Sequence, residues 1–212
     1  MRVFARGERR QAFAVADLTR GGDETLRATL GGRRAAVVYS DPPWNPGNEK
    51  YWRRYAGEAP PSAYDELLDG WCRCVVHAQP MHVFVEQSVN PAHKAMLLRA
   101  IERCEGWRLP FVEEWVCQYG SPKRPNALLH FGPGPLGVDP GGMSGRALVK
   151  TVLGAVVVAP GSLVVDPCMG LGTTSYVSHL LDLDCAGTEL NPARLERTIG
   201  KLVAAGYVEQ PS

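Results

Sequence analysis

Short apolar runs alternate with longer amphipathic stretches along most of the chain. The apolar runs predict buried strands, and the stretches of helical period that follow Asn, Ser or Pro predict helices. Strands are predicted at 35–39, 81–86, 163–166 and 185–189, with one or two more within 107–119. Helices are predicted at 23–30, 62–77, 91–104, 144–159, 173–181 and 192–205, with Ser62 capping the second. Because strands alternate with helices, we expect an α/β fold with an open, mostly parallel sheet flanked by helices on both faces.

The pattern predicts one domain over 35–212. A chain of 212 residues suffices for one such domain with a real core and is short for two. Residues 1–34 are mixed and Arg-rich, so we expect an arm that packs on the core or extends from it. The domain then divides into a first half at 35–119, a Pro- and Gly-rich loop at 120–142 and a second half at 143–205. Within the first half, the polar and aromatic segment 45–61 predicts a mobile loop.

Composition sets few limits on function. The chain is 45% hydrophobic and 21% charged, which is ordinary for a globular protein. Its formal net charge of +1 means that any basic surface for nucleic acid must be local. The six Cys and five His show no spacing typical of a metal site, so we predict free thiols and no metal. We also predict no signal peptide and no membrane span, and therefore a cytoplasmic protein.

The segment Leu163–Thr174 has the pattern of a ligand-binding turn. An apolar strand ends at Asp166, a turn with Gly170 and Gly172 follows, and a helix begins. Glycines allow a sharp turn and close approach of a ligand, and the helix N-terminus offers unpaired N–H groups. Glu189, at the end of the next strand, can accept hydrogen bonds from both hydroxyls of a ribose. We predict an adenosine-cofactor site, and a dinucleotide is disfavoured because the third glycine of its motif is missing.

A second motif, Asp41-Pro42-Pro43-Trp44, directly follows the first strand. An exocyclic amino group on a base is a poor nucleophile because its lone pair is delocalised into the ring. Two acceptors, the Asp41 carboxylate and the Pro42 carbonyl, would bond its two hydrogens and stabilise the charge that develops on nitrogen. The prolines remove competing donors, and Trp44 offers a face on which an extruded base can stack. The alternative is a proline-rich turn with Trp44 as a core side chain.

Together the two motifs resemble those of the S-adenosylmethionine-dependent amino-methyltransferases that act on DNA and RNA bases. Asp41–Trp44 resembles their catalytic motif, Asp166–Thr174 their motif I, and Gly187–Asn191 followed by Arg194 the acidic motif after it. The catalytic motif comes first, which is similar to the permuted "beta" group of DNA amino-methyltransferases. The resemblance covers nearly all of 35–205 and implies a Rossmann-like methyltransferase fold.

The resemblance implies methyl transfer from S-adenosylmethionine to a base amino group, and Asp41 favours adenine N6 in DNA. RNA adenine N6, DNA cytosine N4 and a non-catalytic partner subunit of the same fold stay open. The implied catalytic residues are Asp41, Pro42, Pro43 and Trp44. The implied cofactor residues are Asp166, Pro167, Cys168, Gly170, Gly172, Thr173, Thr174, Glu189 and Asn191, with Ser144 and Arg146 at the helix before motif I. Cys168 and Leu171 depart from the usual Phe and Ser, and the usual Lys-Pro before that helix is missing.

Sequence recognition has little room in this chain. Members of the family usually carry a target-recognition insertion of many tens of residues, whereas here only 45–61 and 120–142 offer space. The candidate nucleic-acid contacts are Lys50, Trp52, Arg53 and Arg54 in the first segment and Lys123 and Arg124 in the second, a mixture that suits phosphate contact and base stacking. The alternative for the first segment is a solvated loop with a buried Trp52. We expect DNA in preference to RNA, a setting such as restriction–modification, and a short site, relaxed specificity, or a homodimer or partner subunit that supplies recognition.

Overall fold

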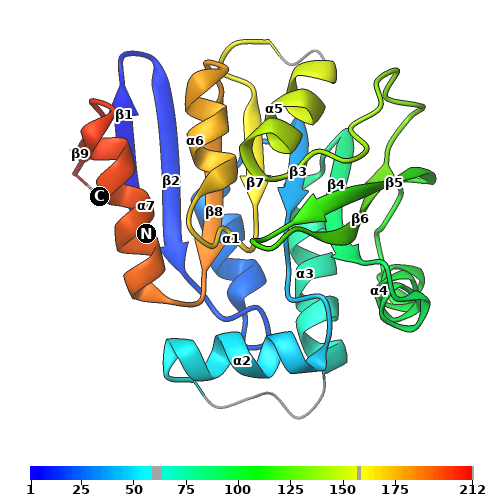
Figure 1. Ribbon diagram of the computed structural model, residues 1–212. Coiled ribbons are helices and arrows are strands. Elements are labelled where there is room, and N and C mark those ends of the chain that lie inside the picture. The colour runs from blue at the N-terminus through cyan, green and yellow to red at the C-terminus, as the bar shows by residue number, and fades with distance from the viewer. Residues whose placement is uncertain (59–63, 157–158, 212) are drawn as a thin grey trace.

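A mixed sheet forms the centre of the computed structural model, which describes residues 1–58, 64–156 and 159–211. Within those residues the sheet has nine strands in the order β5-β6-β4-β3-β7-β8-β2-β1-β9 (Figure 1). The strands are β1 (Arg2–Arg6), β2 (Arg9–Val15), β3 (Val37–Ser40), β4 (His82–Ser88), β5 (Phe111–Tyr119), β6 (Arg124–Phe131), β7 (Leu163–Asp166), β8 (Asp184–Glu189) and β9 (Val208–Gln210). The central strands β4, β3, β7, β8 and β2 run parallel, and β6, β5, β1 and β9 flank them antiparallel to their neighbours.

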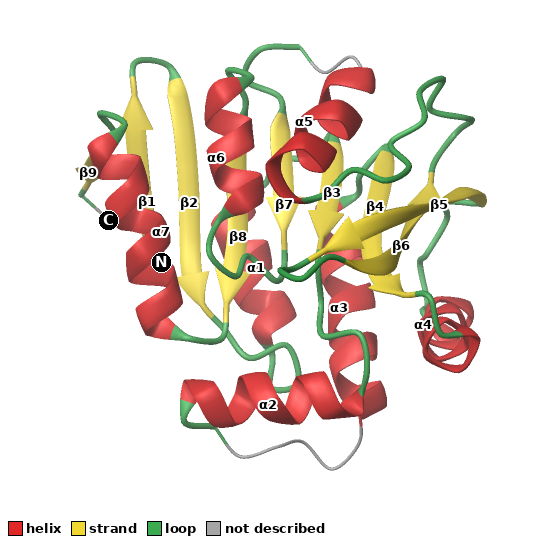
Figure 2. Ribbon diagram, in the orientation of Figure 1, coloured by secondary structure: helices red, strands yellow, loops and turns green. Residues whose placement is uncertain are grey.

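Helices cover both faces of the sheet, which confirms the predicted α/β architecture (Figure 2). The helices are α1 (Gly22–Leu30), α2 (Pro46–Ala56), α3 (Tyr64–Ala78), α4 (Pro91–Arg103), α5 (Gly145–Ala155), α6 (Thr173–Leu180) and α7 (Pro192–Ala204). On one face, α1, α3 and α4 pack around Trp71, which is fully buried. On the other face, α5 and α6 cover Tyr39 and Phe84, while α7 covers Phe4 and Phe13. None of the helices among the described residues is long and apolar enough to cross a membrane.

Asn-Pro pairs begin three of these helices. Asn45, Asn90 and Asn191 each accept a backbone N–H from the first turn of α2, α4 and α7, and Pro follows each Asn directly. The Asn side chain satisfies a donor that the helix leaves unpaired, and Pro sets a helical φ where no N–H is needed. Local sequence therefore determines where these helices start.

Residues 1–34, expected as an arm that packs on the core or extends from it, contribute two strands to the sheet and helix α1 to one of its faces. The β1–β2 hairpin adds to its edge, and β2 pairs in parallel with β8, with Val15 opposite Glu189. The strand signal in β2 is weak because its buried residues include Gln11 beside Ala12 and Ala14. Gln11 is accommodated in the interior by hydrogen bonds with Ser175 and Tyr207.

Two segments expected as loops also contain regular structure. Residues 46–56 form α2, so the expected mobile loop is wrong there: the Asn45 cap starts the helix and Gly57, with φ of 80°, ends it. Within 120–142, Arg124–Phe131 forms β6, whose last six residues are buried between β4 and β5. Ser62 as a helix cap, residues 59–61 of the expected loop and residues 157–158 of the predicted helix lie outside the described residues.

Gly70 gives a stability test of the contact between α3 and the segment before α1. A Cβ at Gly70 would overlap the backbone carbonyl of Leu18, whereas a Cβ at Gly200 in α7 meets no atom within 4 Å. We expect Gly70→Ala to lower the free energy of unfolding by about 1–3 kcal/mol despite the better helix propensity of Ala. The control, Gly200→Ala, should raise it by about 0.5–1 kcal/mol. Urea denaturation measures both, and stabilisation by Gly70→Ala would contradict this packing.

Candidate active site

A cavity of about 360 Å³ lies where the parallel strands end, and α2 crosses the same edge of the sheet (Figure 1). Its walls are the segments that follow β2, β3 and β7, the ends of β4 and β8, and one side of α2. Its volume is in the usual range for small-molecule sites. The lining residues used below are Asp17, Tyr39, Asp41, Pro42, Pro43, Trp44, Glu49, Trp52, Arg53, Glu86, Tyr119, Asp166, Pro167, Cys168, Gly170, Thr173, Thr174, Glu189 and Arg194.

The glycine turn after β7 is tied to the end of β8. Gly170 and Gly172 have φ of 56° and 74°, a region that other residues rarely adopt. The Gly170 N–H donates to Glu189 Oε2 at 2.7 Å, and the Asn191 N–H donates to Glu189 Oε1 at 2.9 Å. Two carboxylate oxygens together offer about four acceptor positions, so Glu189 can still accept from a hydroxyl group of a ligand. This turn supplies the close backbone approach and the acceptor that the motif predicted.

Hydrogen bonds hold the turn after β3 in place. Two of them come from α3, and a third comes from the indole of Trp44 within the turn itself. The Tyr64 hydroxyl donates to the Pro43 carbonyl, and Trp71 Nε1 donates to Ser40 Oγ at 3.1 Å. Trp44 Nε1 donates to Asp41 Oδ1 at 2.8 Å. The Trp44 ring meets Tyr119 of β5 edge to face, with centroids 4.6 Å apart. Asp41 is therefore held in place at the wall with an aromatic pair beside it.

Buried carboxyl groups dominate the electrostatics of the cavity. Burial raises the pKa of Asp41 well above its usual range, and the charge of Glu86 raises it further. Burial also raises the pKa of Asp166 to about 7, against hydrogen bonds from Thr174 and the Cys168 N–H that lower it. The pKa values of Glu86 and Glu189 are raised for the same first reason. Such a site favours a positively charged ligand, which would relieve the repulsion among these groups.

Most residues predicted for catalysis and cofactor binding meet in this cavity. Asp41, Pro42, Pro43, Trp44, Asp166, Pro167, Cys168, Gly170, Thr173, Thr174 and Glu189 line it. Gly172 stands just behind it at the start of α6, and Asn191 caps α7 and donates to the Tyr55 carbonyl at 3.2 Å. Ser144 and Arg146 lie outside the lining; the Arg146 guanidinium instead rests over the Tyr176 ring at 4.1 Å.

The predicted nucleic-acid contacts divide into two groups. Arg53 is 2% exposed; it donates to Asp17 at 2.8 Å and lies 3.5 Å from Glu49, so an internal ion-pair network uses its charge. Trp52 lines the cavity beneath the Arg194 guanidinium, which is 4.3 Å from its ring centre. Lys50, Arg54, Lys123 and Arg124 are exposed. Arg53 and Trp52 therefore lie on the side of α2 that faces the cavity. The predicted loop gave no means of separating these residues from the exposed ones.

Sequence reasoning missed four functional candidates in the lining: Asp17, Glu86, Tyr119 and Arg194. Asp17 follows β2, a strand that the hydrophobic pattern did not reveal. Glu86 and Tyr119 stand at the ends of predicted strands. They could have been found by the pattern that identified Asp41, which is a polar side chain at a strand end. Arg194 was noted only as part of the acidic motif.

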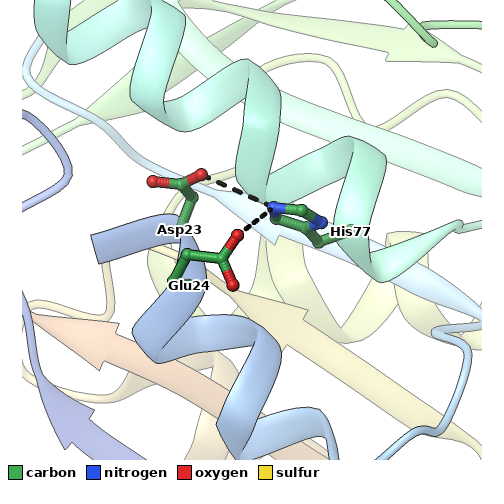
Figure 3. A group of neighbouring side chains, drawn as sticks. All are labelled: Asp23, Glu24 and His77. Atoms are coloured by element: carbon green, nitrogen blue, oxygen red, sulfur yellow. Dashed lines mark ion pairs between the residues drawn. The ribbon is translucent and has the colours of Figure 1, made fainter. Parts of the chain in front are cut away.

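A separate group of polar residues joins α1 to α3, outside this cavity. His77 Nε2 is 3.5 Å from Asp23 Oδ2 and 3.7 Å from Glu24 Oε1 (Figure 3). The same Asp23 oxygen accepts from Arg73 Nε at 3.1 Å. Since an arginine already neutralises the buried carboxylate, we interpret the group as an interhelical ion-pair network.

Comparison with solved structures shows the same fold in several proteins. The chain is similar to M1.HpyAVI (TM-score 0.62, 14% identity, 91% of this chain and 99% of that one). It is similar to TTHA0409 of Thermus thermophilus, a candidate DNA modification methylase (TM-score 0.62, 15% identity, 92% and 95%). It is also similar to the cytosine-N4-specific PvuII DNA methyltransferase (TM-score 0.58, 13% identity, 89% and 85%). The sequence matches no family model and no curated protein. The likeness confirms the Rossmann-like α/β fold expected from the motifs.

The raised pKa of Asp166 predicts a pH-dependent cost to stability. A carboxyl whose pKa rises from 3.8 unfolded to about 7 folded stabilises the protein while protonated, and that contribution is lost as pH rises through 7. Asp166→Asn should therefore be more stable than wild type at pH 8 by on the order of 2–4 kcal/mol, with the difference shrinking toward pH 4. Urea titrations at both pH values measure it, with Asp139→Asn on the exposed loop as control. A difference that is the same at both pH values would contradict the assignment.

Proposed function

We propose that the protein transfers a methyl group from S-adenosylmethionine to an exocyclic amino group of a nucleic-acid base, with adenine N6 in DNA as the target. The observation that carries this proposal is the shared cavity: the Asp41–Trp44 turn and the Asp166–Gly172 turn follow neighbouring parallel strands and face the same space. A donor site and an acceptor site for one transfer need such proximity. M1.HpyAVI and TTHA0409 also have structures in complex with S-adenosylmethionine, which supports the choice of cofactor.

The residues present fit this cofactor. Gly170 lets the backbone pass close to a ligand, and Glu189 stands at the end of β8 with acceptor capacity left for a ribose hydroxyl. The carboxyl groups of Asp41, Glu86 and Asp166 make the cavity favourable for a sulfonium cation. When bound, the cofactor supplies an electrophilic methyl group on a positively charged sulfur.

Asp41 is the residue that activates the amino group. Its Oδ1 accepts a hydrogen bond from Trp44, and this bond orients the carboxylate. The other oxygen, Oδ2, is then available to accept an N–H of the base. The Pro42 carbonyl is the second acceptor, so that both hydrogens are bonded and the nitrogen lone pair is turned toward the methyl group. Trp44 and Tyr119 form the aromatic side of the base pocket, where stacking replaces the neighbours that an extruded base loses.

The choice of adenine rests on Asp41, because the cytosine-N4 members of the family more often have Ser at this position. The likeness to the PvuII enzyme keeps DNA cytosine N4 as the second candidate. The intact set of Asp41, Trp44, Gly170 and Glu189 in one cavity favours an enzyme over a non-catalytic partner subunit. RNA as the substrate is distinguished from DNA by assay.

The exposed side of α2 is our candidate nucleic-acid surface, in place of the predicted loop. Lys50 and Arg54 are exposed there, beside Tyr51 and Tyr55, whose side chains are 58% and 53% exposed and stacked with centroids 6.4 Å apart. Exposed aromatic rings beside basic side chains suit base stacking and phosphate contact. Because this helix follows Asp41–Trp44 directly, nucleic acid bound to it lies next to the base pocket.

Methylation assays with Asp41 variants test the proposed reaction. Wild-type protein with S-adenosylmethionine should methylate DNA, and nucleoside mass spectrometry should identify N6-methyladenine rather than N4-methylcytosine. Asp41→Ala should lower turnover by at least about a hundredfold, the scale of a lost acceptor in the transition state, while calorimetry shows retained cofactor binding. Near-normal turnover in this variant would remove Asp41 from the mechanism, and absence of methylated nucleoside from DNA and RNA with wild type would overturn the proposed function.

The α2 surface predicts a salt-dependent loss of DNA affinity. Replacing Lys50 and Arg54 together by Ala should weaken binding and reduce the slope of log K against log salt by about 0.9 for each lost phosphate contact. Fluorescence anisotropy with a duplex at several salt concentrations measures the slope. Arg99 and Arg108, exposed near the α4 side of the molecule, provide the control pair, whose replacement should leave the slope unchanged. Equal slopes for wild type and the α2 variant would place the nucleic acid elsewhere.

A further inference from the structure

The proposed reaction fixes which way the cofactor lies along the edge of the sheet. The strands that end at this part of the cavity follow the order β3, β7, β8 and β2. Asp41 follows β3, and Glu189, the proposed ribose acceptor, ends β8. In S-adenosylmethionine the sulfur and the adenine are attached at opposite ends of the ribose. A sulfur that points toward Asp41 therefore leaves the adenine pointing toward β2.

The segment after β2 and the inner side of α2 form this end of the cavity. The Ala16 N–H donates to the Glu189 carbonyl at 3.1 Å, which places the end of β2 beside the proposed ribose site. Asp17 comes next in the chain and binds Arg53 of α2. Glu49 stands one turn before Arg53 on the same helix and also lines the cavity. The adenine would therefore meet two carboxyl groups, those of Asp17 and Glu49.

Asp17 is already occupied by donors from the protein. Its Oδ1 accepts from the N–H and the hydroxyl of Thr19 at 3.0 and 2.8 Å and from Arg53 Nη1 at 2.9 Å. Its Oδ2 accepts from Arg53 Nη2 at 2.8 Å. These four donors use the acceptor positions that a carboxylate offers, about four in all. Asp17 therefore anchors α2 and has little capacity left for a ligand.

Glu49 is buried without such donors. The residue is 3% exposed, and its Oε1 lies 3.5 Å from Arg53 Nε but has no hydrogen-bond partner among the residues that the structure describes. A buried acceptor without a donor costs free energy, so folded proteins normally pair it. Rotation about the last bond of a Glu side chain is soft, so the carboxylate can turn an oxygen toward the cavity that Glu49 lines. A donor on a ligand would supply the missing bond.

We propose that Glu49 determines specificity for the base of the cofactor, because its carboxylate accepts a hydrogen bond from the 6-amino group of the adenine. The inference rests on the proposed function, which supplies the orientation of the cofactor. Adenine carries a donor at this position, whereas hypoxanthine carries a carbonyl oxygen there, which a carboxylate repels. Arg53 holds the Glu49 carboxylate from one side, and Asp17 acts through Arg53 as its anchor. The site therefore selects adenine nucleosides over their 6-oxo counterparts.

Calorimetry with two forms of the demethylated cofactor tests this assignment. The probes are S-adenosylhomocysteine and S-inosylhomocysteine, in which a carbonyl oxygen replaces the 6-amino group. Wild type should bind the inosine form about 10- to 100-fold more weakly, the scale of one hydrogen bond to a charged group. Glu49→Gln presents an amide that can also donate to the 6-oxo group, so the two affinities should come within about threefold of each other. Glu58→Gln, the same change at an exposed residue just after α2, is the matched control and should keep the wild-type ratio.

The outcomes separate this inference from the proposed function. If Glu49→Gln, shown by urea denaturation to be folded, weakens both forms equally, Glu49 has a structural role only and the inference is overturned. Asp17→Asn should lower both affinities without changing their ratio, and collapse of the ratio in that variant alone would assign the amino group to Asp17 instead. A wild type that shows the expected ratio but methylates neither DNA nor RNA would overturn the proposed methyl transfer and leave the role of Glu49 in place. A wild type that binds neither form would overturn both.

Discussion

The parallel register of β2, β8, β7, β3 and β4 is the constraint on which the cleft depends. In a parallel sheet every strand delivers its carboxyl end to the same edge, so acidic residues that are distant in sequence become neighbours there. A slip of one residue between β3 and β4 would turn Glu86 to the opposite face and leave Asp41 beside Gln87. The hydrophobic faces of these strands specify the register, and the site takes its geometry from them.

Gathering carboxyl groups at one edge works against stability. Each carboxyl group loses contact with water on folding, and the raised pKa values of Asp41, Glu86 and Asp166 reflect the free-energy cost of that loss. The structure offsets part of it with fixed donors, such as the N–H groups of Gly170 and Asn191 on Glu189. The large apolar clusters around Trp71 and Tyr39 supply most of the stabilising burial. The fold can therefore tolerate unfavourable electrostatics among the carboxyl groups at the edge of the sheet.

The sequence predicted the central strands, most helices and the two turns that meet in the cavity, because strong local patterns specify them. Asp41 and Asp166 follow clear apolar runs, and Asn90 and Asn191 precede Pro at helix starts. The remainder depends on tertiary contacts. β2 was not predicted because Gln11 interrupts its hydrophobic pattern. Gln11 can be buried only because Ser175 and Tyr207, two residues far along the chain, form hydrogen bonds with it. Whether Arg53 faces solvent or Asp17 is likewise decided by the position of α2 beside the segment that follows β2, which local sequence does not encode.

α2 has an inner side that lines the cavity and an outer side that is exposed. Trp52 and Arg53 face inward to the cavity and to Asp17, Asn191 holds the Tyr55 carbonyl, and Tyr51 stands on the outer side. One helix therefore lines the cavity and also presents the outer surface that we propose for nucleic acid. If a ligand in the cavity changes the affinity of the outer side of this helix for a second ligand, the second ligand changes the affinity of the cavity by the same factor, since thermodynamic linkage is reciprocal. Under the proposed function, α2 is therefore the element through which binding of cofactor and binding of nucleic acid would be coupled.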